Sequence, residues 1–114
     1  MTYIYQSEMP FLVKLTPEIH PAANADIFRF HNWLRENNCS FLTLDRFHLA
    51  IGEAYQKIKN NPETWSKVST KSRVRKVQIK SFRMTVFYII RKNGVPLILE
   101  FAGPGMQPRW AYRL

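Results

Sequence analysis

Cysteine is nearly absent from this 114-residue sequence, which contains only Cys39. A lone cysteine excludes an internal disulfide and supplies neither a CxxC pair nor a zinc-binding pattern, so we expect a partly buried free thiol. The three histidines, His20, His31 and His48, also lack the spacing of metal ligands. His31 and His48 fall on expected helices, where histidine is usually interfacial or a satisfied core residue. We therefore expect no metal and no other cofactor.

Long apolar runs are absent as well. No stretch approaches the roughly 18 residues that a membrane span needs, and the N-terminus lacks a charged region followed by an apolar one. The sequence therefore predicts a soluble, cytoplasmic protein without a membrane partner. Nothing marks a nucleophile elbow. Gly103-Pro104-Gly105 is a poor phosphate loop because no helix start follows it closely, and we expect it to form a turn that redirects the tail.

Acidic residues are scarce in the second half of the chain, which carries the whole net charge of +9. Residues 1–60 hold six Lys or Arg and six acids, whereas residues 61–114 hold eleven Lys or Arg against only Glu63 and Glu100. A field of one sign favours a polyanionic partner, either a nucleic acid or an acidic protein segment. The alternative is that these cations only solvate strand edges and discourage edge pairing.

The first half of the sequence predicts a short strand and two helices. Phe11–Leu15 is typical of a strand that stops before Pro17. Thr16, Pro17 and Glu18 form a helix-start pattern, and Pro21 is able to delay or restart that helix. Two apolar stripes at helical period then predict helices that end near Asn37 and Lys59 and form an antiparallel hairpin. The stripe residues are Ala23, Ile27, Phe30 and Leu34 in the first helix, and Leu44, Phe47, Ile51, Ala54 and Ile58 in the second.

The second half predicts a hairpin sheet. Val77 and Ile79 alternate with polar residues, which indicates a half-exposed strand, and Met84–Arg91 is apolar at almost every position, which indicates a central one. Asn93-Gly94 predicts a two-residue type I′ turn, because this dipeptide tolerates positive φ at both central positions. That turn fixes the cross-strand pairs on the core face. They are Ile90 with Leu97, Tyr88 with Leu99, and Val86 with Phe101.

These elements together predict one α+β domain over residues 1–114. At 46% hydrophobic and 14% aromatic residues, the chain has enough apolar material for one core and is too short for two ordinary domains. An N-terminal strand precedes an antiparallel helical hairpin, at about residues 17–60, that packs on a small, mostly antiparallel sheet in the order β-α-α-β-β-β. The basic sheet and tail occupy about residues 73–114, and the tail is expected to lie near the sheet.

Several short motifs occur in an order known from one family of bacterial proteins. They are Leu15-Thr16-Pro17-Glu18, the aromatic-rich segment Ile27–Asn37, Ala54 to Asn61-Pro62, Arg75 in the basic strand, Phe82–Tyr88, the Asn93-Gly94 hairpin, Val95–Phe101 and the tail Pro108–Leu114. Over about residues 11–114 the chain resembles the RelE/ParE superfamily, the toxins of type II toxin–antitoxin modules. This resemblance implies a RelE/ParE-like fold.

The chain departs from the family pattern where catalysis is concerned. In the family's F-P-Y phrase, Arg83 replaces the proline and Met84 the aromatic residue. Gly103-Pro104-Gly105 replaces the histidine or arginine that often follows the last strand, and Met84 or Thr85 stands where mRNA-cleaving members carry a catalytic arginine. These departures favour the ParE-like branch, whose members poison DNA gyrase by contact.

The resemblance implies a growth-inhibiting toxin of the plasmid-stabilisation type that is neutralised by a cognate antitoxin in a hetero-oligomer. Two alternatives stay open, a ribosome-dependent mRNA endoribonuclease of the RelE type and a non-toxic nucleic-acid-binding domain. No small-molecule substrate is implied. In the nuclease, the implied catalytic residues are Lys76, Lys80, Arg83, Arg109, Tyr112 and Arg113. The residues expected to contact a target or partner are Arg73, Arg75, Lys76, Lys80, Arg83, Arg109, Trp110 and Arg113.

Overall fold

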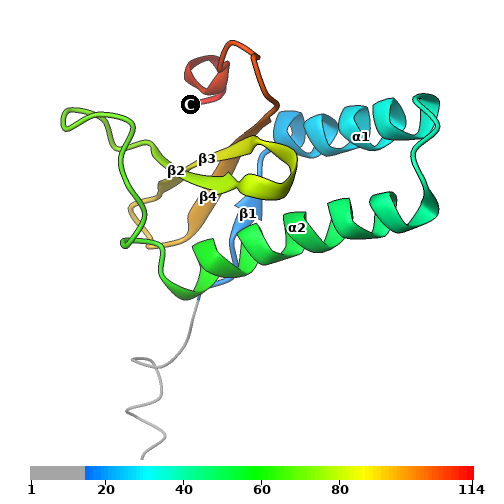
Figure 1. The fold of residues 1–114 in the computed structure, drawn as a ribbon. Coiled ribbons are helices and arrows are strands. Elements are labelled where there is room, and N and C mark those ends of the chain that lie inside the picture. The colour runs from blue at the N-terminus through cyan, green and yellow to red at the C-terminus, as the bar shows by residue number, and fades with distance from the viewer. Residues whose placement is uncertain (1–14) are drawn as a thin grey trace, which may run out of the picture.

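A computed structural model describes residues 15–114, so the strand expected at Phe11–Leu15 lies outside the described residues except for its last position. The described chain is an α+β domain with two helices and a four-stranded sheet in the order β1-β4-β3-β2 (Figure 1), which confirms the predicted fold class. The elements are β1 (Glu18–Ile19), α1 (Pro21–Glu36), α2 (Phe41–Asn60), β2 (Arg75–Ile79), β3 (Met84–Ile90) and β4 (Pro96–Ala102), with 3₁₀ turns η2 (Lys80–Phe82) and η3 (Trp110–Arg113).

The first helix begins at Pro21, the later of the two starts that the sequence left open. Glu18 and Ile19 form β1, which pairs in parallel with β4 at Leu97 and Ile98, so the helix start predicted at Thr16–Glu18 is wrong. The open edge of β4 offers these two residues ladder hydrogen bonds that a first helical turn would not. The helix starts instead at Pro21, whose missing N–H is not needed in a first turn.

Both helices pack on the same side of the sheet, α1 over β4 and α2 over β2. Ser40 caps α2 by accepting a hydrogen bond from Thr43 N at 3.1 Å, as expected of a capping hydroxyl. The predicted stripes face the sheet and form the main core with residues of the strands, which include Val77, Ile79, Met84, Val86, Tyr88, Ile98 and Phe101. Cys39 is a partly buried free thiol, as predicted. Within residues 15–114, neither helix has the length and apolar character needed to cross a membrane.

The turn between β3 and β4 differs from the predicted type I′ turn. Of the two residues expected at positive φ, only Gly94 adopts it, with φ of 85°. Arg91 O accepts from Gly94 N at 2.8 Å, and Arg91 N donates to Val95 O at 3.0 Å. The loop therefore runs over the residues between Arg91 and Val95, one residue more than predicted. Such loops end in a residue of left-handed conformation, which Gly94 supplies.

The longer turn makes two predicted cross-strand pairs wrong. The structure pairs Ile90 with Pro96 in place of Leu97, and Tyr88 with Ile98 in place of Leu99. Between Phe87 and Tyr88 the register shifts, because Leu99 is an extra residue that bulges from β4. Beyond this bulge the predicted pair of Val86 and Phe101 is confirmed.

The longer turn and the bulge together decide which residues face away from the helices. This outer face carries a second, smaller cluster formed by Val74, Phe87, Ile89, Leu99 and Ala102, with Val68, Leu97 and Trp110 packed against it. The C-terminal tail crosses the outer face (Figure 1), so its expected position near the sheet is confirmed. The sheet is thus a middle layer between two helices and the tail.

Candidate functional site

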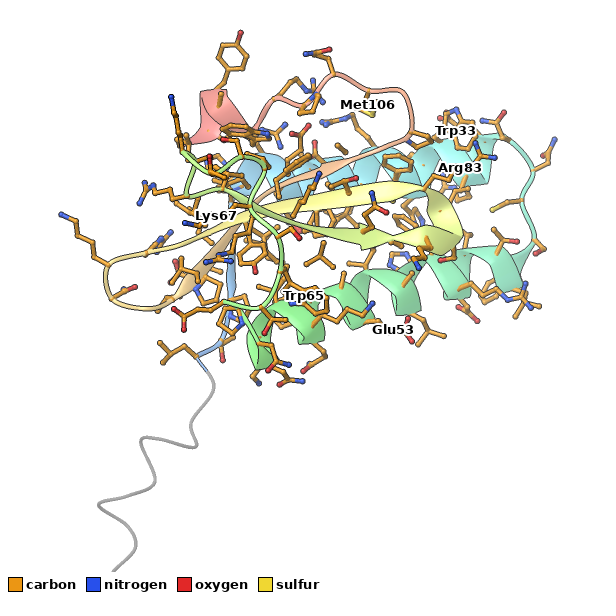
Figure 2. The ribbon with its side chains drawn as sticks, turned by 60° about the vertical axis from the view of Figure 1, so that its left-hand side comes forward. Trp33, Glu53, Trp65, Lys67, Arg83 and Met106 are labelled. Carbon is orange, nitrogen blue, oxygen red and sulfur yellow. The ribbon has the colours of Figure 1, made fainter. Side chains whose placement is uncertain are left out.

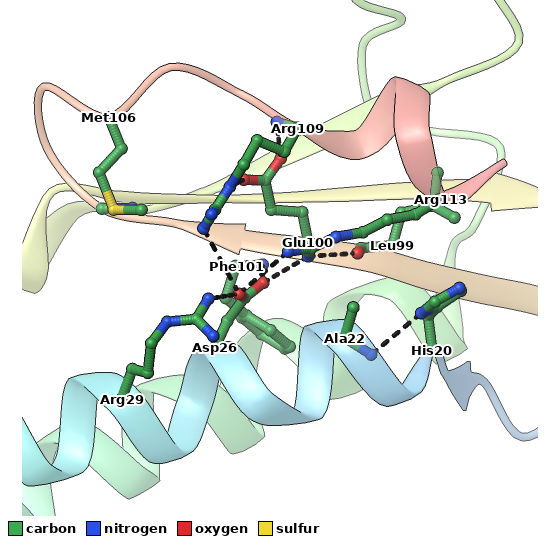
Figure 3. Close-up of polar contacts among 11 residues, drawn as sticks. His20, Ala22, Asp26, Arg29, Leu99, Glu100, Phe101, Met106, Arg109 and Arg113 are labelled. Atoms are coloured by element: carbon green, nitrogen blue, oxygen red, sulfur yellow. Dashed lines mark hydrogen bonds and ion pairs between the residues drawn. The ribbon is translucent and has the colours of Figure 1, made fainter.

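Asp26 is the centre of an ion-pair cluster that joins α1 to the end of β4 and to the tail (Figure 3). Its side chain is only 2% exposed. One carboxylate oxygen accepts from Phe101 N at 3.0 Å and from Arg113 Nη1 at 2.7 Å, and the other pairs with Arg29. The sequence held a signal for this residue, because Asp26 lies three positions after Ala23, on the apolar stripe of α1.

Arg113 is a structural residue of the tail. Its side chain is 10% exposed, and Nη1 donates to both the Asp26 carboxylate and Leu99 O, the latter at 2.9 Å. The hydrogen bond and the charge of Asp26 raise the pKa of the Arg113 guanidinium, although burial opposes the rise. This residue therefore fixes η3 to the outer face of the sheet.

Glu100 supplies a second buried carboxylate beside Asp26. Glu100 Oε1 accepts from Arg109 N at 2.7 Å, whereas Oε2 has no hydrogen-bond partner among the described residues. The nearest cation to Oε2 is Arg109 Nε at 4.0 Å, and Arg109 Nη2 also lies 4.0 Å from Asp26. The cluster thus joins two carboxylates to three guanidinium groups and retains one net positive charge.

Arg75 holds the loop after α2. Its Nη1 donates to Trp65 O at 2.7 Å and to Glu63 O at 3.1 Å. Tyr88, on the neighbouring strand, donates its hydroxyl to Pro62 O. Burial raises the pKa of Tyr88 to about 12, against a smaller lowering by the Arg75 charge. Arg75 and Tyr88 together tie residues 62–65 to the sheet.

The remaining site residues predicted from the sequence do not converge on one point. Lys76 lies opposite Phe87 on the outer face, where Trp110 packs with ring centroids 6.3 Å apart. Arg83 lies at the corner after η2, with φ of 53°. Arg73, Lys76, Lys80, Arg83 and Tyr112 are exposed, and Tyr112 is 91% exposed. The structure therefore separates these side chains from Arg75 and Arg113, which are engaged within the fold.

A cleft that sequence reasoning missed lies between α1, the η2 corner and the loop after β4 (Figure 2). Its volume is about 810 Å³. Most of its wall is apolar, and its lining includes Phe30, Trp33, Phe82, Phe101 and Met106. Trp33 lies beside the apolar stripe of α1, and its exposure at 57% was not evident from the sequence.

Within residues 15–114, no three His, Cys, Asp or Glu side chains gather as metal ligands. His31 Nδ1 and His48 Nε2 lie 2.9 Å apart and satisfy each other across the two helices, in line with their expected interfacial role. No family model, curated protein or solved structure matches this chain.

Proposed function

We propose that this protein is the toxin of a type II toxin–antitoxin module, of the ParE-like kind. It inhibits growth by binding DNA gyrase and is neutralised by a cognate antitoxin in a cytoplasmic complex. The family and the target rest on the sequence resemblance described above. The choice between a contact inhibitor and a nuclease rests on the positions of the arginines.

One observation carries that choice, namely that Arg113 is used inside the fold. Withdrawing this side chain towards a substrate would leave Asp26 without its most buried cationic partner, and breaking a buried ion pair costs about 3–5 kcal/mol. Arg75 is similarly engaged with two carbonyl groups of the loop after α2. An mRNA cleaver instead needs several cations preorganised around one phosphate.

The exposed cations suit a contact surface. Lys76, Lys80 and Arg83 lie along β2 and the corner that follows it, and they are exposed. Dispersed cations steer an acidic macromolecule to the protein and raise the association rate. Tyr112 and Trp110, in the same basic half, supply aromatic anchors of the type that dominates interface energies.

Induction of the protein in bacterial cells tests the proposal. We expect growth arrest with intact mRNA and a DNA-damage response, and recovery when an acidic protein from the adjacent reading frame is expressed with it. The purified complex should dissociate at high salt, because acidic segments meet basic ones. Codon-specific cuts in a translation extract, lost in Lys80→Ala or Arg83→Ala, would support the endoribonuclease. An absence of growth arrest would leave the non-toxic nucleic-acid-binding domain.

A further inference from the structure

The cleft between α1, the η2 corner and the loop after β4 is preformed. A Cβ on Gly103 would lie 2.2 Å from Phe30 Cζ, so only glycine allows the loop to approach the helix this closely. Gly103 N also lies 3.3 Å from Met106 Sδ, which holds this side chain against the loop. Phe30 in turn stacks on Phe47, with ring centroids 6.1 Å apart. The walls of the cleft are therefore continuous with the core.

Large apolar side chains at the rim of the cleft are exposed. Trp33 and Met106 line the cleft and are 57% and 39% exposed, and Figure 2 shows both beside Arg83. Exposed apolar groups around a concave surface mark a binding site for another molecule. A volume of about 810 Å³ accommodates a few large side chains. Trp33 at the rim remains more than half exposed, which indicates that the occupant extends beyond the concavity, as a protein segment does.

Charge at the rim selects the chemistry of that segment. Arg83 has no ion pair among the described residues. Arg29 pairs with Asp26, is 54% exposed, and retains donors that do not face this carboxylate. Glu36 and Asp26 are the acids among the residues that line the cleft. Because the Asp26–Glu100 cluster, with Arg29 included, keeps one net positive charge, the part of the cleft beside Arg29 attracts carboxylates.

We propose that the cleft binds an acidic amphipathic helical segment of a partner protein. Apolar side chains at positions i and i+3 or i+4 of that segment insert between Trp33 and Met106. Carboxylates beside them meet Arg83 and Arg29. Assigning the segment to the antitoxin rests on the proposed function, whereas the preference of the cleft for an acidic amphipathic helix does not.

A defined probe tests the preference of the cleft. The probe is a fluorescein-labelled peptide of about 16 residues with leucine at helical i, i+3, i+4 and i+7 spacing and glutamate elsewhere, and its control is a scrambled peptide of the same composition. We expect fluorescence anisotropy to give at least tenfold tighter binding of the probe than of the control. Equal affinities would overturn the proposal, because charge alone would then explain the attraction. An absence of binding would also overturn it, because the cleft would then not bind such a helix.

Variants locate the bound peptide. Trp33→Ala should weaken binding at least tenfold, since aromatic anchors dominate such interfaces, and Leu49→Ala, at an exposed apolar residue of α2, should leave it unchanged. Arg83→Gln should weaken it about threefold at low salt and less at high salt, whereas Lys92→Gln in the β3–β4 turn should have no effect. Unchanged binding in Trp33→Ala would exclude the cleft.

The antitoxin assignment is tested separately with the protein that copurifies from coexpression of the adjacent reading frame. If this complex forms and Trp33→Ala weakens it, the cleft is the antitoxin site. If it forms and both Trp33→Ala and Arg83→Gln leave it intact, the assignment is wrong while the proposed function stands. If no complex forms but the peptide still binds the cleft, the proposed function fails and the preference of the cleft stands.

Discussion

Replacing Asp26 with asparagine should strongly destabilise the fold. Asparagine has the size of aspartate and still accepts from Phe101 N, but it carries no charge to compensate Arg113, whose side chain is 10% exposed. An unpaired buried charge costs about 3–5 kcal/mol. Glu100 also contributes favourably to the charged state of Arg113, so we expect the lower end, about 3 kcal/mol.

Urea unfolding followed by circular dichroism measures this loss as a lower midpoint at an unchanged slope. The matched control is Arg29→Gln, which removes the exposed partner of the same carboxylate and should cost no more than about 1 kcal/mol. In the Asp26→Asn background, Arg113→Met should cost less than it does in the wild type, since the charge without a partner is then gone. A loss below about 1 kcal/mol in Asp26→Asn would show that the cluster does not hold the tail.

Two further predictions concern the sheet. Gly94→Val should destabilise the protein by about 1–3 kcal/mol in thermal melts, because a β-branched residue is forced to φ of 85° and its Cβ meets Leu15 Cδ1 at 3.2 Å. Gly94→Asn should cost less. An unchanged melting midpoint in the valine variant would contradict the left-handed conformation of residue 94. The folded pKa of Tyr88 is raised to about 12, so its contribution to stability is complete below the unfolded pKa and is lost as pH rises through about 10 to 12. Tyr88→Phe should remove this part of the pH dependence, and equal alkaline curves for both proteins would refute it.

The layers of the fold were predictable because they depend on local periodicity. Helical spacing of apolar residues identified both core-facing stripes, and alternation in β2 placed Val77 and Ile79 inward and Lys76 outward. Both signals lie within one element and need no knowledge of distant residues.

The register near the β3–β4 turn was not predictable in the same way. A one-residue change in loop length moves every following side chain to the opposite face unless a bulge cancels it. Here the longer loop turns Ile98 towards the helices, and the bulge at Leu99 returns Phe101 to the face predicted for it. The advantage of this arrangement lies in packing on both faces of the sheet, which no short stretch of sequence encodes.

The pairing within the ion-pair cluster of Asp26 was not predictable from the sequence. The excess of cations lies in the second half of the chain, yet the acid that binds the tail lies in the first half. Asp26 and Arg113 are 87 residues apart in the chain. They meet only because α1 packs over β4, so the structural role of Arg113 depended on the tertiary fold.

Tyr112 offers the sharpest separation of a contact inhibitor from a nuclease. At 91% exposure it contributes little to the fold, so neither Tyr112→Phe nor Tyr112→Ala should change the melting temperature. A contact surface uses mainly the ring, and we expect the phenylalanine variant to stay toxic while alanine weakens toxicity, with a loss of about 1–3 kcal/mol in target binding. Colony counts after induction, at matched protein levels, measure the effect. A nuclease that uses the hydroxyl for proton transfer would lose about a hundredfold in either variant, so an inactive Tyr112→Phe protein would reject the contact inhibitor.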